Sequence, residues 1–535
     1  MKKLLDLLNV LESYFIYKND DVLSSVSIAG IAIDSREDVE GKLFVAEKGF
    51  KFDGVKFVEG AIKDGAVAVI VQEGSEEKLV KEAIELIENK KVPLIVVPNT
   101  SIAVSEICNE FYDVKPKYIC GITGTNGKTT IVDFTRQIWS ELGVKAASMG
   151  TIGLQVSFDS PKIRELIEFV DGKGLTTLDV VSTHYVLSEL KKEGVDYVAM
   201  ETSSNGLEQR RCDLPFVAGG FSSFEIDHLD FHDGIEGYFS SKKILFNHLI
   251  VDGGFAVVNN DMNDFAGISV VEDLIKVSKE RGLNLVRYGK TGEDVKILFE
   301  EVRDGKIYSA ISFFGKEFDL VFPMNNHYMF LSALNAAIFA YATLGKGRLD
   351  DIVFALENLK DVNGRFEFVG NAKSGASIYV DYAHNGEAIR NILQEAKDKV
   401  AGENGKVISV IGGAGEKPKE RLQELAKYSV EYSDVAVLTT DSPRSENPND
   451  IVKKMLEISP SAVGIINRIV AVGKAIELSG NDDVIVICGK GHEKTISLAG
   501  KDYYISDKQI VEYLLEGKAD DNLKAEMEEY NSVIG

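Results

Sequence analysis

The chain has 535 residues and a mass of 58.7 kDa. At about 150 residues per domain, this length predicts three or four domains. Hydrophobic residues make up 44% and charged residues 27%, which excludes a disordered, collagen-like or disulfide-scaffold chain. The formal net charge of −24 argues against a general binder of nucleic acid or anionic membranes, although a local basic site could still hold a phosphate.

The first 115 residues predict a small α/β domain, because short apolar runs (KLFVAEKG, AVAVIVQE, VPLIVVPN) alternate with helical patterns. Residues 1–15 read as an amphipathic helix and not as a signal peptide, since Asp6, Asn9 and Glu12 interrupt the apolar residues. No stretch approaches the roughly 18 apolar residues of a membrane span. The cysteines have no CxxC or metal spacing and are expected to be buried thiols in a reducing compartment. They are Cys108, Cys120, Cys212 and Cys488.

A linker around Pro116 separates this domain from a central domain, residues 116–361. Its first apolar run, 118–122, leads through glycines into apolar residues at helical spacing over 131–142, the βα unit of a parallel sheet. The remainder, 362–535, alternates strands and helices (SIYVDYAH, KVISVIGGAG, DVAVLTTDSPR, DDVIVICGKGHE). We therefore predict three α/β domains: a small N-terminal one, a central parallel sheet with a phosphate loop, and a Rossmann-like, doubly wound C-terminal one.

Residues 121–130, GITGTNGKTT, have the composition of a phosphate loop between a strand and a helix. Gly124 and Gly127 let backbone N–H groups surround phosphate oxygens, Lys128 neutralises the terminal phosphates, and the Thr129 hydroxyl can ligate Mg²⁺. The spacing departs by one residue from GxxxxGK[ST], so the loop is a variant. The predicted nucleotide-binding residues are Gly124, Thr125, Asn126, Gly127, Lys128, Thr129 and Thr130.

The variant loop resembles that of the Mur ligase superfamily, and further motifs resemble its MurE-type members, in the same order along nearly the whole chain. These motifs are Asp34-Ser35-Arg36, KFDG at 51–54, ETSSNGL at 201–207, DHLDFH at 227–232, Tyr238-x3-Lys242, Gly364-Arg365, DYAH at 381–384, DSPR at 441–444 and GKGHE at 489–493.

The resemblance implies an ATP-dependent amide ligase that adds a free amino acid to a UDP-linked cell-wall peptide through an acyl phosphate. The N-terminal domain would bind the UDP precursor, and the C-terminal domain the incoming amino acid. The implied cofactors are ATP and two Mg²⁺ ions. We expect a cytoplasmic enzyme that acts as a monomer and binds neither nucleic acid nor a membrane, although the sequence leaves the oligomeric state open.

The resemblance also implies the catalytic set, which includes Lys128. Glu201 ends a predicted strand beside the phosphate loop and would ligate the Mg²⁺ shared with Thr129. His228 would offer a neutral imidazole to a second Mg²⁺. Lys242 stands where the family has a carbamylated lysine, because CO₂ addition turns the amine into an oxygen-rich anion that suits Mg²⁺. Carbamylation requires a depressed lysine pKa.

The resemblance also implies which residues bind the nucleotide, the amino acid and the UDP precursor. Asn326, Arg365 and Asp381 would reach the nucleotide, so that domain closure assembles the site. Arg444 would pair with a carboxylate of the amino acid, and Glu493 with its ammonium. The other amino-acid contacts are Asp441, Ser442 and Gly489. The UDP-precursor contacts are Ser35, Arg36, Thr176, Thr177 and Ser203.

The chain departs from the family pattern at 221–226, at Asn205, which replaces a histidine, and at Ser442, which replaces an asparagine. Met329 takes the place of the second asparagine of N-x-x-N, and 415–421 replace the basic GDRD-type loop. The metal and phosphate residues are intact, while adenine and substrate contacts differ. This pattern indicates the same chemistry on a different acceptor or amino acid.

Several alternatives stay open. One is an archaeal pseudomurein peptide ligase with a UDP-glutamyl peptide acceptor. A folylpolyglutamate-synthase-like ligase would lack the N-terminal domain and the DxPR and GKGHE motifs. A non-catalytic UDP-peptide binder would not need the retained Lys128, Glu201, His228 and Lys242, and a regulatory NTPase would need an NKxD that Asn89–Val92 does not supply. Arg444 with Glu493 favours diaminopimelate as the added amino acid, whereas Ser442 leaves lysine or another diamine possible.

Overall fold

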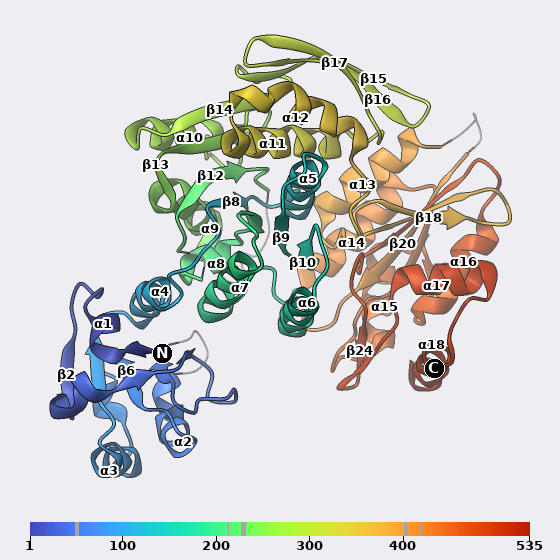
Figure 1. Ribbon diagram of the computed structural model, residues 1–535. Helices are drawn as coiled ribbons and strands as arrows, with labels where there is room; N and C mark the ends of the chain where they lie inside the picture. The colour runs from blue at the N-terminus through green and yellow to red at the C-terminus, as the bar shows by residue number, and fades with distance from the viewer. Residues whose placement is uncertain (49–52, 212, 226–231, 401–404, 418, 535) are drawn as a thin grey trace. The chain divides into compact units, whose positions relative to one another are not determined.

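The structure is a computed structural model that describes residues 1–48, 53–211, 213–225, 232–400, 405–417 and 419–534. By contacts it forms two compact units (Figure 1). Unit 1 comprises Met1–Leu298, Ala310–Leu320 and Leu331–Leu356, and unit 2 comprises Phe299–Ser309, Val321–Phe330 and Glu357–Gly535.

The N-terminal part of unit 1 is a five-stranded sheet in the order β2-β7-β6-β5-β4. Its strands are β2 (Phe15–Lys18), β4 (Ile31–Ala32), β5 (Leu43–Ala46), β6 (Ala68–Gln72) and β7 (Leu94–Val97), all parallel except β2. The helices are α1 (Leu4–Leu8), α2 (Val58–Lys63), α3 (Lys81–Lys90) and α4 (Thr100–Phe111). Apolar clusters cover both faces, which explains why the parallel strands read as continuous apolar runs. Only Leu4–Leu8 of the helix expected over 1–15 is helical; Lys2–Lys3 form a short strand, β1, paired with β3 (Ser27–Ile28).

The central sheet has ten strands in the order β10-β9-β11-β8-β12-β13-β14-β15-β16-β17. β9, β11, β8, β12, β13, β14 and the start of β15 pair in parallel, and β10 is antiparallel to β9. The strands are β8 (Tyr118–Thr123), β9 (Ala146–Gly150), β10 (Gly153–Val156), β11 (Tyr197–Glu201), β12 (Phe216–Phe221), β13 (Ile250–Asn259), β14 (Asn284–Gly289), β15 (Val295–Arg303), β16 (Lys306–Phe313) and β17 (Lys316–Phe322).

The helices of this region are α5 (Lys128–Glu141), α6 (Pro161–Lys173), α7 (Val180–Lys192), α8 (Ser204–Glu208), α9 (Gly234–Ile244), α10 (Val270–Glu280), α11 (His327–Leu344) and α12 (Leu349–Ala355). α5 follows β8 directly and is fixed by Trp139, which is fully buried. The indole Nε1–H of Trp139 donates to Thr343 Oγ1 (2.9 Å). A buried aromatic ring with its polar atom satisfied anchors the helix firmly, so the start of α5 has a fixed place beside the sheet.

α11 corrects one expectation about membrane spans. Its 18 residues have a mean hydropathy of 1.2, so by length and composition it could cross a membrane, but 72% of it is buried inside the molecule. Polar residues such as Ser332 and Asn335 interrupt its apolar sequence, which is why no continuous run stands out. Such burial is typical of the core helix of a globular domain.

Unit 2 contains a six-stranded sheet in the order β18-β19-β23-β20-β21-β22, parallel except for β18. Its strands are β18 (Glu367–Asn371), β19 (Ser377–Asp381), β20 (Val407–Gly413), β21 (Val435–Thr440), β22 (Val463–Gly464) and β23 (Val484–Cys488). The helices are α13 (Gly386–Asp398), α14 (Lys419–Tyr432), α15 (Pro448–Ile458), α16 (Arg468–Leu478), α17 (Asp507–Glu516) and α18 (Asp521–Ile534). A hairpin of β24 (Ile496–Leu498) and β25 (Lys501–Tyr503) precedes α17.

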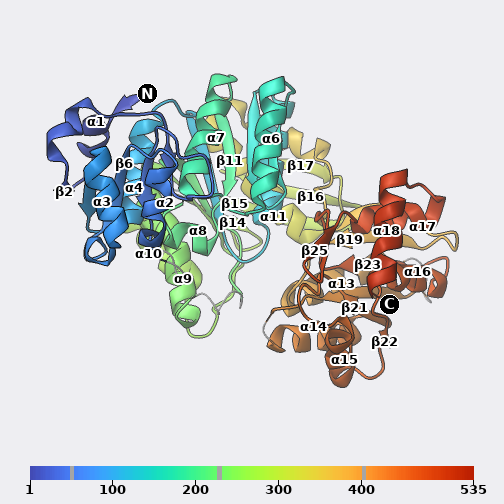
Figure 2. The ribbon, with the colours of Figure 1, turned by 90° about the horizontal axis from the view of Figure 1, so that it is seen from below.

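The strand order of unit 2 places β23, last of the parallel strands in sequence, between β19 and β20. The loops after β19, β20, β21 and β23 therefore leave the same edge of the sheet, where doubly wound folds bind ligands. α16 and α17 lie side by side (Figures 1 and 2). Cys108, Cys120 and Cys488 are buried free thiols, as expected, and Cys212 lies outside the described residues.

His184 in α7 is fully buried. Its ring stacks on that of Tyr112, with centroids 6.5 Å apart. In the part of the chain that the structure describes, neither ring nitrogen has a hydrogen-bond partner. Burial, with a smaller contribution from Lys115, lowers the pKa of His184 from 6.5 to about 3. Folding therefore favours the neutral imidazole, and its stabilising contribution is lost as the pH falls from the unfolded-state pKa toward the folded one.

We predict that acidification from pH 7 to pH 5 costs the wild-type protein about 2 kcal/mol more unfolding free energy than it costs His184→Phe. Phenylalanine keeps an aromatic ring beside Tyr112 and cannot be protonated. Urea denaturation followed by fluorescence at both pH values measures the difference. Equal losses of unfolding free energy in the two proteins would contradict the low pKa of His184 in the folded state.

Candidate active site

The predicted phosphate loop connects β8 to α5. Gly124 (φ +139°) and Gly127 (φ +85°) have left-handed backbone conformations that favour glycine. A Cβ on Gly124 would lie 2.1 Å from Ser222 Oγ, so no side chain fits there. The Lys128 ammonium donates to the carbonyl oxygens of Gly124 (2.9 Å) and Thr125 (2.8 Å). It thus curls over the loop at the N-terminus of α5, where phosphate oxygens are favoured.

The segment Ser222–Glu225 supports this loop. Thr125 N–H donates to the Ser223 carbonyl (2.9 Å), and Asn126 N–H donates to Ser223 Oγ (2.8 Å). The Asn126 side-chain amide donates to Glu225 Oε2 (2.7 Å). In the sequence, this segment stands out only as a departure from the family pattern. Its serines and glutamate instead fix the backbone of the loop.

Glu201 ends β11 beside the start of α5 and is 1% exposed. Its Oε1 accepts from Thr129 Oγ1 (2.9 Å) and from Thr151 N–H (2.8 Å), while its Oε2 accepts from Thr151 Oγ1 (3.1 Å). The structure therefore brings Glu201 and Thr129 together. Thr151 was missed, although its place directly after an apolar strand and between two glycines is a signal that could have found it.

Thr176, Thr177 and Ser203 are linked to Glu201 through its main-chain carbonyl or through Thr151. Thr177 Oγ1 lies 3.1 Å from the Glu201 carbonyl and 3.0 Å from Ser203 Oγ. Thr151 Oγ1 lies 3.2 Å from Thr176 Oγ1. These three predicted acceptor contacts thus form one hydroxyl-rich cluster beside the Mg²⁺ candidates.

Ser35 and Arg36 follow β4 in the N-terminal part of unit 1. Arg36 is an exposed side chain whose Nε donates to Asp34 Oδ1 (2.9 Å). This pairing holds the pKa of the Asp34 carboxyl below its usual range, against a smaller raising effect of burial. The loop places a basic group at the surface, but it is not part of the hydroxyl cluster around Glu201.

Lys242 on α9 is 2% exposed. Its ammonium donates to the Gly124 carbonyl (2.7 Å) and lies 4.4 Å from the centroid of the Tyr238 ring. The structure therefore places Lys242 against the phosphate loop, on the buried side of α9. His228 lies outside the described residues.

In unit 2, Asp381 at the end of β19 accepts from the N–H groups of Phe366 (2.7 Å) and Ala383 (2.6 Å). Burial raises the pKa of Asp381. The Arg365 guanidinium lies 4.6 Å from the centroid of the Tyr382 ring. Asp381 thus orders the backbone next to Arg365.

Asn326 belongs to unit 2 by contacts. Its Oδ1 accepts from Met329 N–H (2.8 Å) at the start of α11, and its side-chain amide bonds to Glu395. Burial raises the pKa of Glu395 to about 8. Within this unit, Asn326 therefore acts as a helix-start residue.

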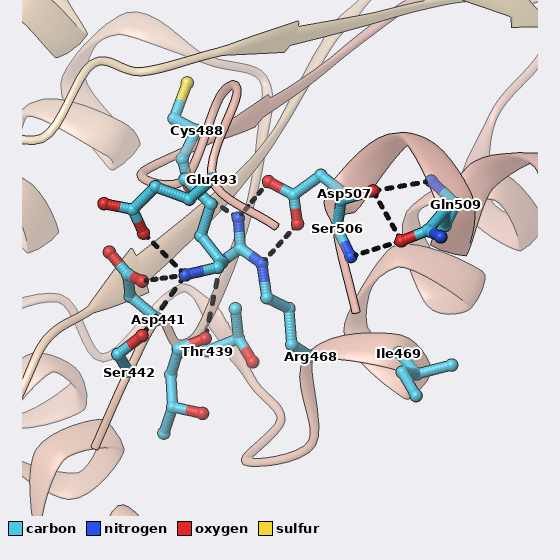
Figure 3. Close-up of polar contacts among 12 residues, drawn as sticks. Thr439, Asp441, Ser442, Arg468, Ile469, Cys488, Glu493, Ser506, Asp507 and Gln509 are labelled. Carbon is cyan, nitrogen blue, oxygen red and sulfur yellow. Dashed lines mark hydrogen bonds and ion pairs between the residues drawn. The ribbon is translucent and has the colours of Figure 1, made fainter. Parts of the chain in front are cut away.

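Lys490 joins two predicted amino-acid-binding motifs, whose residues Asp441, Ser442 and Glu493 are labelled in Figure 3. Its fully buried ammonium donates to Asp441 Oδ1 (3.3 Å), Ser442 Oγ (3.2 Å) and Glu493 Oε2 (2.7 Å). Burial acts to lower the pKa of Lys490, but Asp441 and Glu493 hold it above its ordinary value. Burial raises the pKa of Glu493, which Lys490 opposes. This role of Lys490 was not predicted from the sequence, although the lysine lies inside GKGHE.

Arg444 stands beside this cluster in a left-handed backbone conformation (φ +57°), which a non-glycine residue adopts only when its surroundings enforce it. Its N–H donates to the Ser497 carbonyl (2.9 Å), and its own carbonyl accepts from Ala499 N–H (2.7 Å). The side chain is 42% exposed and lies 3.9 Å from Glu416 Oε2. These hydrogen bonds fix the backbone of Arg444, while its guanidinium is partly exposed. Binding of a carboxylate would require such an accessible guanidinium.

Three family models match the chain: "Mur ligase family, catalytic domain" over residues 27–112, "Mur ligase middle domain" over 122–338, and "Mur ligase, glutamate ligase domain" over 364–491. Two relatives carry the name UDP-N-acetylmuramoyl-L-alanyl-D-glutamate--2,6-diaminopimelate ligase. The protein of Chelativorans sp. (strain BNC1) is 34% identical and covers 92% of this chain and 95% of its own length. That of Caulobacter vibrioides is 33% identical and covers 92% and 96%.

Solved structures agree in fold. A structure of UDP-N-acetylmuramoyl-L-alanyl-D-glutamate--2,6-diaminopimelate ligase has a TM-score of 0.62 at 24% identity and covers 96% of this chain and 99% of that one. The MurF ligase of Thermotoga maritima, in complex with ADP, has a TM-score of 0.56 at 19% identity and covers 94% and 98%. The expected three-domain α/β fold is confirmed, while the boundaries at 115 and 361 stay a prediction. The chain belongs to the Mur ligase family and is a ligase that forms C–N bonds.

Proposed function

We propose that the protein binds ATP at the phosphate loop of unit 1 and joins an amino acid, held by unit 2, to a carboxylate of a UDP-linked cell-wall peptide. The observation that carries the proposal is the buried Glu201 carboxylate against Thr129 at the start of α5 (2.9 Å). A carboxylate and a hydroxyl next to a phosphate loop are the ligands that Mg²⁺–ATP needs. ATP as co-substrate supports the cytoplasmic location expected from the sequence.

The chemistry divides into two steps. The acceptor carboxylate attacks the γ-phosphate of ATP, giving an acyl phosphate and ADP. The amino group of the incoming amino acid then attacks the acyl carbon, the amide forms, and inorganic phosphate leaves. Lys128 would neutralise charge on the phosphoryl group during transfer, together with the N–H groups that begin α5.

The residues present fit a divalent cation, since Glu201 and Thr129 offer hard oxygen ligands of the kind that Mg²⁺ prefers. No cluster of three or more His, Cys, Asp or Glu of metal-holding geometry occurs among the described residues. The remaining ligands would be waters, phosphate oxygens, the carbamate of Lys242 and His228, which lies outside the described residues. Bound Mg²⁺ would stabilise negative charge on the phosphates. Lys242 fits the proposed modification because it is buried against the phosphate loop.

For the amino acid, we propose 2,6-diaminopimelate. The relatives named above are diaminopimelate ligases, and unit 2 offers the half-exposed Arg444 for a carboxylate beside the Asp441–Lys490–Glu493 cluster. Together these groups suit a distal end that carries both a carboxylate and an ammonium. For the acceptor we propose the UDP-muramoyl dipeptide that the relatives' names contain.

The proposal is tested by phosphate release from the purified protein with ATP and Mg²⁺. UDP-muramoyl dipeptide and a UDP-glutamyl peptide are crossed with diaminopimelate, lysine, ornithine and alanine. We expect release with the muramoyl acceptor and diaminopimelate, and little with lysine, because lysine leaves Arg444 without a carboxylate. Turnover only on the UDP-glutamyl acceptor would assign the chain to pseudomurein synthesis. No amino-acid-dependent release with either acceptor would overturn the proposed substrates.

Lys128→Ala is expected to lower ATP-dependent ligation by about 100-fold or more, because the transferring phosphoryl group loses its nearest cation. Lys145→Ala is the matched control, since Lys145 is exposed and lies outside the site. It should ligate like the wild type. Circular dichroism checks that both variants are folded. Full activity in a folded Lys128→Ala protein would remove Lys128 from the site.

Lys242→Ala should abolish ligation, and added acetate should restore part of it by supplying the missing carboxylate group. Its neighbour Lys243 provides the control, because Lys243 pairs with Asp273 (3.2 Å) at the edge of α9 and not with the phosphate loop. Lys243→Ala should keep its activity and show no response to acetate. If acetate has no effect on a folded Lys242→Ala protein, the carbamate assignment fails.

A further inference from the structure

Arg468, the first residue of α16, is fully buried and holds the ends of two strands (Figure 3). One terminal nitrogen, Nη2, donates to the carbonyl of Cys488 (2.9 Å), the last residue of β23. The other, Nη1, lies 3.3 Å from the carbonyl of Thr440, the last residue of β21. The next residues along the chain begin the Asp441–Arg444 and Gly489–Glu493 motifs.

β20 runs between these two strands, and the guanidinium passes over it at Gly412. A Cβ on Gly412 would lie 2.4 Å from Arg468 Nη1, so only glycine leaves room for the group. One planar side chain thus spans three neighbouring strands at the edge of the sheet where the binding loops begin. Its fork of fixed N–H directions sets the spacing of the two carbonyl groups.

Asp507, the first residue of α17, completes the arrangement. Its carboxylate is also fully buried and accepts two hydrogen bonds from Arg468, Nε to Oδ1 (2.6 Å) and Nη2 to Oδ2 (2.7 Å). A reciprocal capping box of Ser506 and Gln509 fixes the start of α17. The pair is neutral overall, and each partner is anchored at the beginning of a helix.

Stability alone is a weak reason for such a pair, because a buried ion pair seldom stabilises a fold more than well-packed apolar residues would. The position of the Arg468–Asp507 pair beneath the two loops gives a better reason for its presence. Lys490 links Asp441, Ser442 and Glu493 directly above the strand ends that Arg468 holds. Burial acts to raise the pKa of Asp441, but the charge of Lys490 and, to a smaller extent, that of Arg468 hold it below its usual range.

We propose that Arg468, oriented by Asp507, is a positioning residue for the incoming amino acid: it fixes the distance between the Asp441–Arg444 and Gly489–Glu493 loops before the amino acid binds. The inference rests on the proposed function, since it assumes that these loops hold the amino acid. Neither Arg468 nor Asp507 faces the solvent, so both act through the loops and neither touches the substrate.

The test is the KM of each substrate in Arg468→Lys. Lysine keeps the positive charge for Asp507 but cannot bond both carbonyl groups with a planar fork. A displacement of the loops by about 1 Å would raise the KM for the amino acid by about tenfold or more. The KM values for ATP and the UDP-linked acceptor should stay within about twofold, because their predicted contacts lie outside the 441–444 and 489–493 loops. A KM for the amino acid that does not change in the folded variant overturns the proposal.

Arg281→Lys is the matched control. Arg281 also joins carbonyl groups, those of Asn247 (2.7 Å) and Ile250 (2.9 Å), and pairs with Asp252, but it lies in unit 1. Its substitution should leave all three KM values within about twofold. An equal rise of the amino-acid KM in both variants would show a general loss of stability and would refute the positioning role.

A second variant and a measurement on the wild type cover the case in which Arg468→Lys does not fold. Asp507→Asn keeps one acceptor oxygen for the guanidinium and should raise the amino-acid KM in the same selective way. Hydrogen–deuterium exchange of the wild type without substrates should show slow exchange of the 441–444 and 489–493 amides. Fast exchange that slows only when the amino acid is added would mean that the substrate, and not Arg468, orders the loops.

Arg444→Ala separates this inference from the proposed function. If Arg444→Ala leaves the KM for the amino acid unchanged, the loops do not hold the amino acid, and the proposed function of unit 2 fails. If Arg444→Ala raises that KM while Arg468→Lys does not, the proposed function stands and only the positioning role is refuted.

Discussion

The buried carboxylate of Glu201, held against Thr129, is the interaction on which the site of unit 1 depends. It ties the end of β11 to the start of α5 and, through Thr151, to the end of β9. Because β11 pairs in parallel with both β8 and β9, the carboxyl ends of these three strands meet at one edge of the sheet. A single buried acid therefore organises the phosphate loop, the candidate metal ligands and the hydroxyl cluster together.

In unit 2, loops also meet at the carboxyl-end edge of a parallel sheet, and here buried cations hold them in place. These loops carry acidic side chains that repel one another when buried. Lys490 offsets the charges of Asp441 and Glu493, while Arg468 with Asp507 holds the strand ends beneath them. The polar groups near Arg444 are thereby ordered without a ligand, and this order would reduce the entropy lost if the amino acid binds there as proposed.

The predicted phosphate loop shows which parts of the site can be predicted from contiguous sequence. Its glycines, lysine and threonines form a contiguous pattern with a known physical purpose, and the structure has that strand, loop and helix where expected. Thr151, Ser223 and Glu225 could not be found in this way. They contact the site from segments far apart in the sequence, and isolated polar residues at strand ends are common.

By itself the sequence determined the alternation of apolar strands and helices, the glycine-rich loop between β8 and α5, and the family of ligases to which the chain belongs. Each of these depends on residues that are contiguous or that occur as ordered motifs. Only the tertiary structure decided which buried charges face one another. Arg468 and Asp507 are 39 residues apart and Lys490 and Asp441 are 49 apart. Their pairing depends on the order of strands in the sheet, which places β23 beside β20, one strand from β21, and no local pattern encodes that order.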